Sequence, residues 1–183
     1  MIVGLGFLVT FTGQINEWIL TILLKPMQED LGWSRSAIVV SRMLSLVGSA
    51  AAAPIMGRIV DRYGARGIIV AASITQAVIL LLCSFMNDLW HLYLLFIVSG
   101  VVVGSTLVGI APLTAVANWF VRRRGWAMAI ALAGASFGGA IFVLFGQTIL
   151  ERAGWRMVWM SLAIMPLIFT VGPVWVLMKR RPE

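Results

Sequence analysis

Six long apolar stretches constrain this chain more than any other feature of its sequence. A helix needs roughly 20 apolar residues to cross the hydrocarbon core of a bilayer. We expect six such helices, over about residues 2–24, 36–57, 67–86, 91–117, 126–149 and 157–178. The connections are short and hold no soluble domain. The sequence therefore predicts an all-α membrane protein, with one six-helix transmembrane domain over residues 1–183.

The composition agrees with a chain whose main surroundings are a lipid bilayer. Hydrophobic residues make up 61% of the sequence and charged residues 11%, whereas soluble domains are roughly half apolar and a quarter charged. The net charge of +7 comes from short basic clusters between apolar runs, so we expect no nucleic-acid partner. The sequence has no metal-ligand spacing and no nucleotide-binding loop, so we expect neither a metal nor a cofactor.

Lysine and arginine are unevenly distributed between the two sets of connections. One side collects Arg58, Arg62, Arg66, Arg122, Arg123, Arg124, Lys179, Arg180 and Arg181. The other side has Lys25, Arg35, Arg152 and Arg156, diluted by acids. Short basic loops tend to stay in the cytoplasm. We therefore expect a multi-pass protein of the cell membrane, inner or plasma, with both termini in the cytoplasm.

Two charged segments share one pattern. "DRYGAR" begins at residue 61 and "ERAGWR" at residue 151, and both read acid, Arg, any residue, Gly, any residue, Arg. In the expected topology, the same turn recurs three helices later on the opposite face of the membrane. That recurrence is expected of an inverted repeat of three helices plus three, an arrangement found in transporters. The alternative is two unrelated basic turns.

The first of these segments resembles a family signature. "GRIVDRYGAR" is similar to the loop between helices 2 and 3 of the major facilitator superfamily, matching it at Gly57, Asp61, Arg62, Gly64 and Arg66. It departs from that signature at Ile59 and Ala65. The segments "LGWSRS", "NWFVRRRGWAMAIALAGASFGG", "GWR" and "KRRPE" are similar to the branch of monocarboxylate carriers and oxalate/formate exchangers. Helix 4 lacks the Arg of many proton-coupled members, and helix 5 lacks the Pro of the antiporter signature.

The resemblance implies both a fold and a function. Members have twelve helices in two halves, and this chain is similar to the first half, so we expect the second half to be absent from this sequence. We expect either a fragment or a natural half-transporter that pairs with a second copy. The implied function is secondary active transport of small organic anions such as monocarboxylates, by alternating access, with or without proton coupling. The substrate, the direction and the coupling ion stay open.

The resemblance also implies that the signature loop acts as a latch. In the family, this cluster holds the two halves in the outward-open state. From the residues themselves, we expect Asp61 to accept hydrogen bonds from Arg62 or Arg66, or to face a helix N-terminus. Gly64 would permit a turn that other residues resist, and Gly57 would permit close helix packing. The alternative is a plain turn that sets topology, which explains the arginines but not the acid.

Two charges lie deep within the apolar spans. Glu17 belongs to a polar stripe on helix 1 with Thr10, Gln14 and Thr21, and Arg42 lies on helix 2. Counting ~1.5 Å per residue, both lie at similar depths below the outer loop. Such charges normally face a partner or a watery cavity. Arg42 is a candidate anion ligand, and Glu17, with Gln14 beside it, a candidate proton or gating site; the alternative is a structural ion pair.

Glycines at small-xxx-small spacing occur on helices 4 and 5. Gly100 with Gly104, and Gly134 with Gly138, would let helix backbones approach closely. "GASFG" also matches the G-x-S-x-G pattern of hydrolases, and an intramembrane serine protease of rhomboid type is one alternative function. His91 is expected near the outer interface, so we expect no dyad with Ser136 and no enzyme. A non-transporting membrane scaffold is the other alternative.

Overall fold

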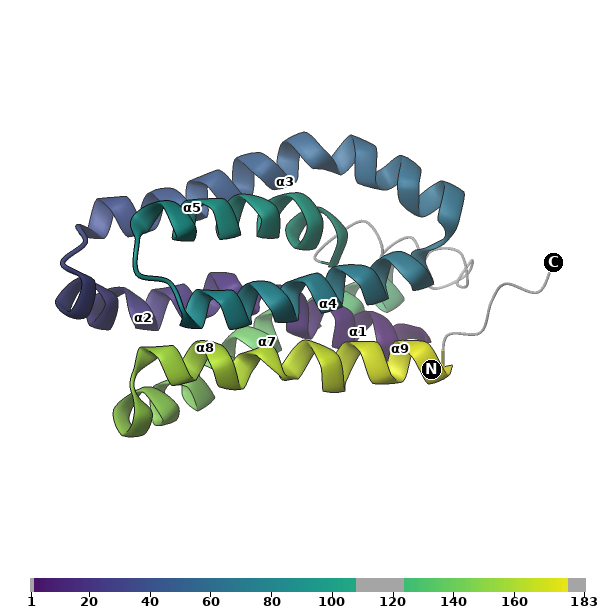
Figure 1. The fold of residues 1–183 in the computed structure, drawn as a ribbon. Helices are drawn as coiled ribbons and strands as arrows, with labels where there is room; N and C mark the ends of the chain where they lie inside the picture. Colours follow the sequence, from purple (N-terminus) through teal and green to yellow (C-terminus); the bar gives the residue numbers. More distant parts are fainter. Residues whose placement is uncertain (1, 108–123, 178–183) are drawn as a thin grey trace.

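The computed structural model describes residues 2–107 and 124–177, and its regular elements are helices that run along one common direction (Figure 1). They are α1 (Ile2–Gly13), α2 (Ile15–Leu31), α3 (Arg35–Tyr63), α4 (Ala65–Ser84), α5 (Leu89–Val98), the π-helical turn η1 (Ser99–Gly104), α7 (Arg124–Ala153), α8 (Trp155–Ala163), the π-helical turn η3 (Leu167–Val171) and α9 (Gly172–Leu177).

Five helical stretches are long and apolar enough to cross a membrane. They are Val3–Leu31, Arg35–Tyr63, Ala65–Ser84, Gly125–Ala153 and Trp155–Val176. A sixth apolar helix, Leu89–Gly104, is shorter, and the rest of the expected fourth span, residues 108–117, lies outside the described residues. The chain is therefore a multi-pass all-α membrane protein. Several helices, such as α2, α3 and α7, extend beyond the expected apolar spans, because a helix can continue into polar residues outside the hydrocarbon core.

The turns between helices gather at two opposite ends of the bundle. The α3–α4 turn lies at the same end as the start of α1 and the end of α9 (Figure 1). The α2–α3, α4–α5 and α7–α8 turns lie at the other end. We call the first end the motif end and the second the opposite end. The two charged segments of the repeat thus lie at different ends of the bundle.

The packing of the helices follows the symmetry of an inverted repeat. We number the membrane segments 1 (α1 and α2), 2 (α3), 3 (α4), 4 (α5 and η1), 5 (α7) and 6 (α8, η3 and α9). Segment 1 packs mainly against segment 5, segment 2 against segment 4, and segment 3 against segment 6. An exchange of 1 with 4, 2 with 5 and 3 with 6 turns the first pair into the second and leaves the third unchanged. The fold is therefore a 3+3 inverted repeat.

The repeated charged segments make the same kind of turn. Gly64 and Gly154 both have a φ of 81°. The Gly64 N–H donates to the Val60 carbonyl at 2.9 Å, and the Gly154 N–H to the Leu150 carbonyl at 3.1 Å. Each glycine therefore closes one helix and opens the next. The alternative of two unrelated turns does not account for this shared conformation.

The core runs through the described bundle, and every membrane segment contributes buried apolar residues to it. Its largest fully buried side chains include Trp159, Phe96, Phe142, Ile15, Ile19, Leu23 and Met27. The ring of Phe11 in α1 lies 4.7 Å from that of Phe142 in α7, centroid to centroid. This contact packs segment 1 against segment 5. The packing sets the orientation of segment 1, and with it the side of α2 on which its polar residues lie.

Candidate functional site

A break in the first membrane segment positions the deepest acid. α1 ends at Gly13 and α2 begins at Ile15, while Gln14 between them has φ −104° and ψ 14°. The Gln14 carbonyl accepts hydrogen bonds from the backbone N–H groups of Glu17 (3.1 Å) and Trp18 (3.2 Å). Glu17 therefore lies in the first turn of α2, where the helix dipole favours a negative charge.

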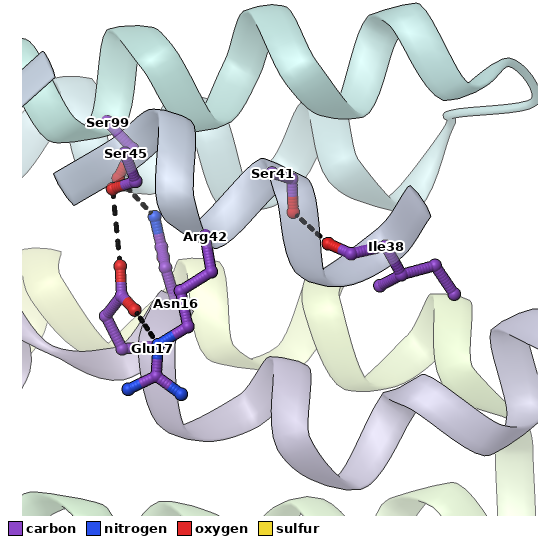
Figure 2. Close-up of polar contacts among 7 residues, drawn as sticks. All are labelled: Asn16, Glu17, Ile38, Ser41, Arg42, Ser45 and Ser99. Atoms are coloured by element: carbon purple, nitrogen blue, oxygen red, sulfur yellow. Dashed lines mark hydrogen bonds and ion pairs between the residues drawn. The ribbon is translucent and has the colours of Figure 1, made fainter. Parts of the chain in front are cut away.

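Glu17 and Arg42 form an ion pair between α2 and α3. The distance from Arg42 Nε to Glu17 Oε2 is 2.8 Å (Figure 2). The Ser45 hydroxyl, one turn further along α3, donates to Glu17 Oε1 at 3.3 Å. Among the described residues, Oε2 of Glu17 accepts no hydrogen bond of standard geometry. The contact between Arg42 and Glu17 is therefore mainly an electrostatic attraction.

The outer fork of Arg42 is not used by this pair. Figure 2 shows its two terminal nitrogens pointing away from the Glu17 carboxylate. Within residues 2–107 and 124–177, neither of them makes a hydrogen bond or ion pair, and 48% of the side chain is exposed, against 21% for Glu17. Arg42 also lines a pocket of about 530 Å³ between α2 and α3. A guanidinium that lines a pocket and whose fork has no partner can bind an anion through two parallel hydrogen bonds.

A second polar pair lies beside the first, and the sequence reasoning missed it. Asn16 Nδ2 donates to Ser99 Oγ of η1 at 2.7 Å (Figure 2). Both side chains are buried, and the Asn16 Oδ1 has no hydrogen-bond partner among the described residues. A single small polar residue in an apolar span does not indicate by itself which helix it contacts. The only sequence signal for Asn16 was its position next to Glu17.

The predicted packing glycines bring segments 2 and 4 together behind this site. A Cβ at Gly100 would clash with the carbonyl oxygen of Ser45, and one at Gly104 would lie 3.2 Å from the Ser49 hydroxyl oxygen. This close approach places the backbone of Ser45 directly against η1. Segments 1 and 5 meet in the same way, because a Cβ at Gly134 would clash with the carbonyl oxygen of Phe7.

Gly138 makes an equivalent contact one turn later. A Cβ there would clash with the carbonyl oxygen of Phe11. All four glycines therefore lie at close helix approaches, two at the contact of segments 2 and 4 and two at that of segments 1 and 5.

The polar stripe expected on helix 1 divides at Gln14. Thr10 is fully buried and donates to the Ala131 carbonyl in α7, whereas Thr21 is exposed and lines the pocket with Arg42. Gln14 is partly buried, and its side chain makes no hydrogen bond within the described residues. A continuous stripe was therefore the wrong picture, because the break in segment 1 separates the residues before Gln14 from those after it.

The signature residues lie mostly within a helix rather than a loop. α3 continues through Tyr63, so Gly57, Asp61 and Arg62 are helical and only Gly64 forms the turn. The expectation of close packing at Gly57 is wrong for the described residues, since nothing among them lies within 4 Å of a Cβ placed there. Gly57 faces outward from this part of the bundle.

Asp61 does not accept a hydrogen bond from Arg62 or Arg66, so that part of the expectation is wrong. The alternative, that Asp61 faces a helix N-terminus, stays a prediction. Arg62 lies over the ring of Tyr63, with 5.5 Å from Cζ to the centroid. Arg66 Nη2 instead donates to the Trp175 carbonyl at 2.6 Å, and its Cζ lies 5.1 Å from the Trp175 ring centroid. The reason is the turn at Gly64, which places Arg66 at the start of α4, and α4 packs against α9. Asp61 itself is exposed.

Arg156, which corresponds to Arg66 in the second charged segment, connects helix ends at the opposite end of the bundle. Arg156 Nη2 donates to Asn87 Oδ1 at 3.1 Å, and Nη1 lies 3.7 Å from Asp30 Oδ2. The neighbouring Trp155 Nε1 donates to the same Asp30 oxygen at 2.9 Å. Arg66 thus fastens the start of segment 3 to the end of segment 6, and Arg156 fastens the start of segment 6 to the chain just after segment 3.

The serine and histidine of the hydrolase alternative lie apart. Ser136 is in the middle of α7, a continuous helix without the sharp elbow of that motif. His91 lies in the first turn of α5, where its Nδ1 is 3.5 Å from Asp88 Oδ2. Over residues 2–107 and 124–177, no three potential metal ligands come together.

Comparisons with known proteins agree on one family. A family model described as the Major Facilitator Superfamily matches residues 6–183. The fujikurins efflux protein of Gibberella fujikuroi is 35% identical over 107 residues, which cover 56% of this chain and 22% of that protein. Monocarboxylate transporter 11 of Homo sapiens is 31% identical over 130 residues, covering 70% and 26%. Monocarboxylate transporter 2 of Mus musculus is 26% identical over 156 residues, covering 84% and 31%. The chain thus spans less than a third of each of these relatives.

Proposed function

Because the chain belongs to the major facilitator superfamily, a family of membrane transporters, we propose that it is the N-terminal half of a secondary transporter for small organic anions such as monocarboxylates. It works by alternating access together with a second six-helix half or a second copy of this chain. Two of the relatives carry monocarboxylate in their names, and they support this substrate class by similarity.

One observation carries the proposal: Arg42 lines a pocket between α2 and α3, and its guanidinium fork is not taken up by Glu17. Its Nε stays 2.8 Å from Glu17 while its terminal nitrogens point away (Figure 2). A carboxylate that binds this fork gains charge-assisted hydrogen bonds that replace part of its hydration shell. A purely structural ion pair gains most when the fork faces the carboxylate, because a bidentate contact is the stronger one.

Glu17 gives the site a counter-ion when no substrate is bound. A carboxylate that reaches Arg42 brings a second negative charge close to Glu17, and two like charges repel at short distance. A proton taken up by Glu17 removes that repulsion. We therefore assign Glu17 the proton or gating role, with Ser45 holding its Oε1 and Gln14 forming the break next to it.

The motif end faces the cytoplasm in this proposal, with both termini on that side. Basic residues of short loops favour this orientation. Gly57, Asp61 and Arg62 then form an inward-facing surface that meets the second half and acts as the latch, while Gly64 and Arg66 fix the turn below it. The exposure of Asp61 supports this role, because an acid that contacts another half has to be accessible on the surface of its own half.

Uptake of radiolabelled pyruvate and phenylacetate tests the proposal. Variants are made in the native gene, so that each chain is expressed with its natural continuation or partner. Arg42→Gln should abolish uptake, and Arg42→Lys should retain a small part, because an ammonium cannot reproduce the bidentate fork. Arg152→Gln, which removes an exposed charge at the opposite end of the bundle, is the matched control and should leave uptake unchanged. Normal uptake by Arg42→Gln, normalised to surface protein, would refute the proposed role.

A further inference from the structure

The pocket that ends at Arg42 holds two more cations. It lies between α2 and α3, and its charged lining residues are Lys25, Arg35 and Arg42. Lys25 lies two turns after Glu17 on α2, and Arg35 two turns before Arg42 on α3, which places both roughly 10–12 Å closer to the opposite end. The three positive charges therefore form two levels. Lys25 and Arg35 form the level nearer the opposite end, which we call the mouth, and Arg42 forms the deeper level, which we call the floor.

The mouth-level charges are not neutralised by acids in the pocket wall. Among the described residues that line the pocket, none is acidic. The nearest acid to Lys25 is Glu29, at 3.9 Å, and both side chains are largely exposed, so water screens this pair strongly. Arg35 makes no ion pair with any described residue. The mouth is consequently a region of positive potential that attracts anions.

The wall between the two levels is apolar. Leu20, Leu24 and Val39 line it together with Thr21, while the other uncharged polar lining residue, Gln28, follows Lys25 by three residues at the mouth. A volume of about 530 Å³ falls in the usual range for pockets that enclose a small organic molecule. This combination of a cationic mouth, an apolar wall and a cationic floor suits a carboxylate that carries an apolar body.

We propose that Lys25 and Arg35 form a separate capture site for carboxylates with an apolar body, which such anions occupy before they reach Arg42. This inference rests on the proposed function for the step at Arg42, but the capture site itself binds without that step. An anionic lipid headgroup offers the same chemistry to Lys25 and Arg35. The free anion is the ligand we infer, because the pocket continues down to Arg42.

A capture site changes how fast anions arrive and leaves the rate of the transport step unchanged. Electrostatic attraction raises association rates by about tenfold or more and weakens with salt. We expect the double variant Lys25→Gln, Arg35→Gln to raise KM for phenylacetate about tenfold while Vmax stays the same. Its KM should also depend less on ionic strength than that of the wild type. Arg152→Gln is the control at the same end, and Lys25→Arg with Arg35→Lys should restore the wild-type KM.

The assay in vesicles separates the two sources of anion. In vesicles of phosphatidylcholine alone, which carry no anionic lipid, the tenfold rise in KM should persist. A rise that appears only when phosphatidylglycerol is present would show that Lys25 and Arg35 bind lipid headgroups, and would overturn the inference.

A binding measurement distinguishes failure of the capture site from failure of the proposed function. Phenylacetate should raise the melting temperature of the purified Arg42→Gln protein, whether or not that variant transports, and uncharged phenylacetamide should not. The rise should disappear when Lys25→Gln and Arg35→Gln are added. The capture site does not exist if phenylacetate stabilises the triple variant as much as the Arg42→Gln protein. It also does not exist if phenylacetate stabilises neither the Arg42→Gln protein nor the wild type.

Discussion

Gly64 and Gly154 have the same φ of 81°, at corresponding places in two copies of one charged segment at opposite ends of the bundle. Their ψ angles are 152° and 171°, in a region that only glycine adopts readily. The two charged segments therefore share a backbone conformation as well as a residue pattern. Because the same kind of turn occurs at both ends of the bundle, the inverted repeat is visible both in the sequence and in the backbone conformation.

An added methyl group at either turn should destabilise the protein. We expect Gly64→Ala and Gly154→Ala each to cost about 1–3 kcal/mol, because alanine is strained at this φ. Gly67→Ala is the matched control, since Gly67 is in a helix and no described residue lies within 4 Å of the added carbon. Thermal unfolding of the detergent-solubilised proteins measures the effect. Equal melting temperatures for Gly64→Ala and Gly67→Ala would contradict it.

The contact of Gly100 with Ser45 should be the most sensitive packing position near the site. Gly100→Ala places a methyl group against backbone that cannot move aside, and overpacking of this kind costs about 1–3 kcal/mol or more. We expect a clear loss of folded protein in the membrane. Gly125→Ala, where no atom of the described residues lies within 4 Å of the added carbon, should express as the wild type does. Fluorescence size-exclusion profiles compare the two, and a well-folded Gly100→Ala protein would show that segment 4 does not press on segment 2.

Much of the fold follows from sequence, because hydropathy and a repeated motif are local signals. The apolar spans predict a helical membrane protein, and "DRYGAR" with "ERAGWR" predicts the inverted repeat. The break at Gln14 and the π-helical turn at Ser99–Gly104 do not follow, since each depends on how two helices meet.

The site shows the same division. Glu17 and Arg42 stand out because isolated charges in apolar spans are costly and need a partner. Their depth also places them together, since one short turn joins their helices. In contrast, Arg66 was expected near Asp61 and instead reaches Trp175, more than a hundred residues away in the chain. No local pattern records that contact.

The orientation can be checked without any transport assay. Tyr63, 70% exposed, lies at the motif end, and the exposed Ala153 at the opposite end. In intact cells, Ala153→Cys should react with an impermeant thiol reagent, and Tyr63→Cys should react only after permeabilisation. The native Cys83 is fully buried and gives little background. Labelling of Tyr63→Cys from outside would reverse the proposed orientation.

Removal of the Asp61 charge tests the latch. Asp61→Asn keeps the size of the side chain, so insertion should be normal while transport falls several-fold, because the state that the latch stabilises is lost. Glu151→Gln is the matched control from the second copy of the segment, where the acid accepts a hydrogen bond from Gln147 at 3.0 Å. If Asp61→Asn and Glu151→Gln transport equally well, the segment at 61–66 only sets topology.

The central claim is that Arg42 binds the transported anion and does not merely neutralise Glu17. In Arg42→Ala, a carboxylate is left without its partner, which lowers the amount of folded protein. Adding Glu17→Gln removes that unpaired charge, so the double variant should return to near wild-type surface levels. The decisive measurement is uptake of radiolabelled phenylacetate by Glu17→Gln, Arg42→Ala, normalised to surface protein. Our account predicts good insertion with no uptake, because the cation that holds the anion is gone, whereas full recovery of uptake would contradict it.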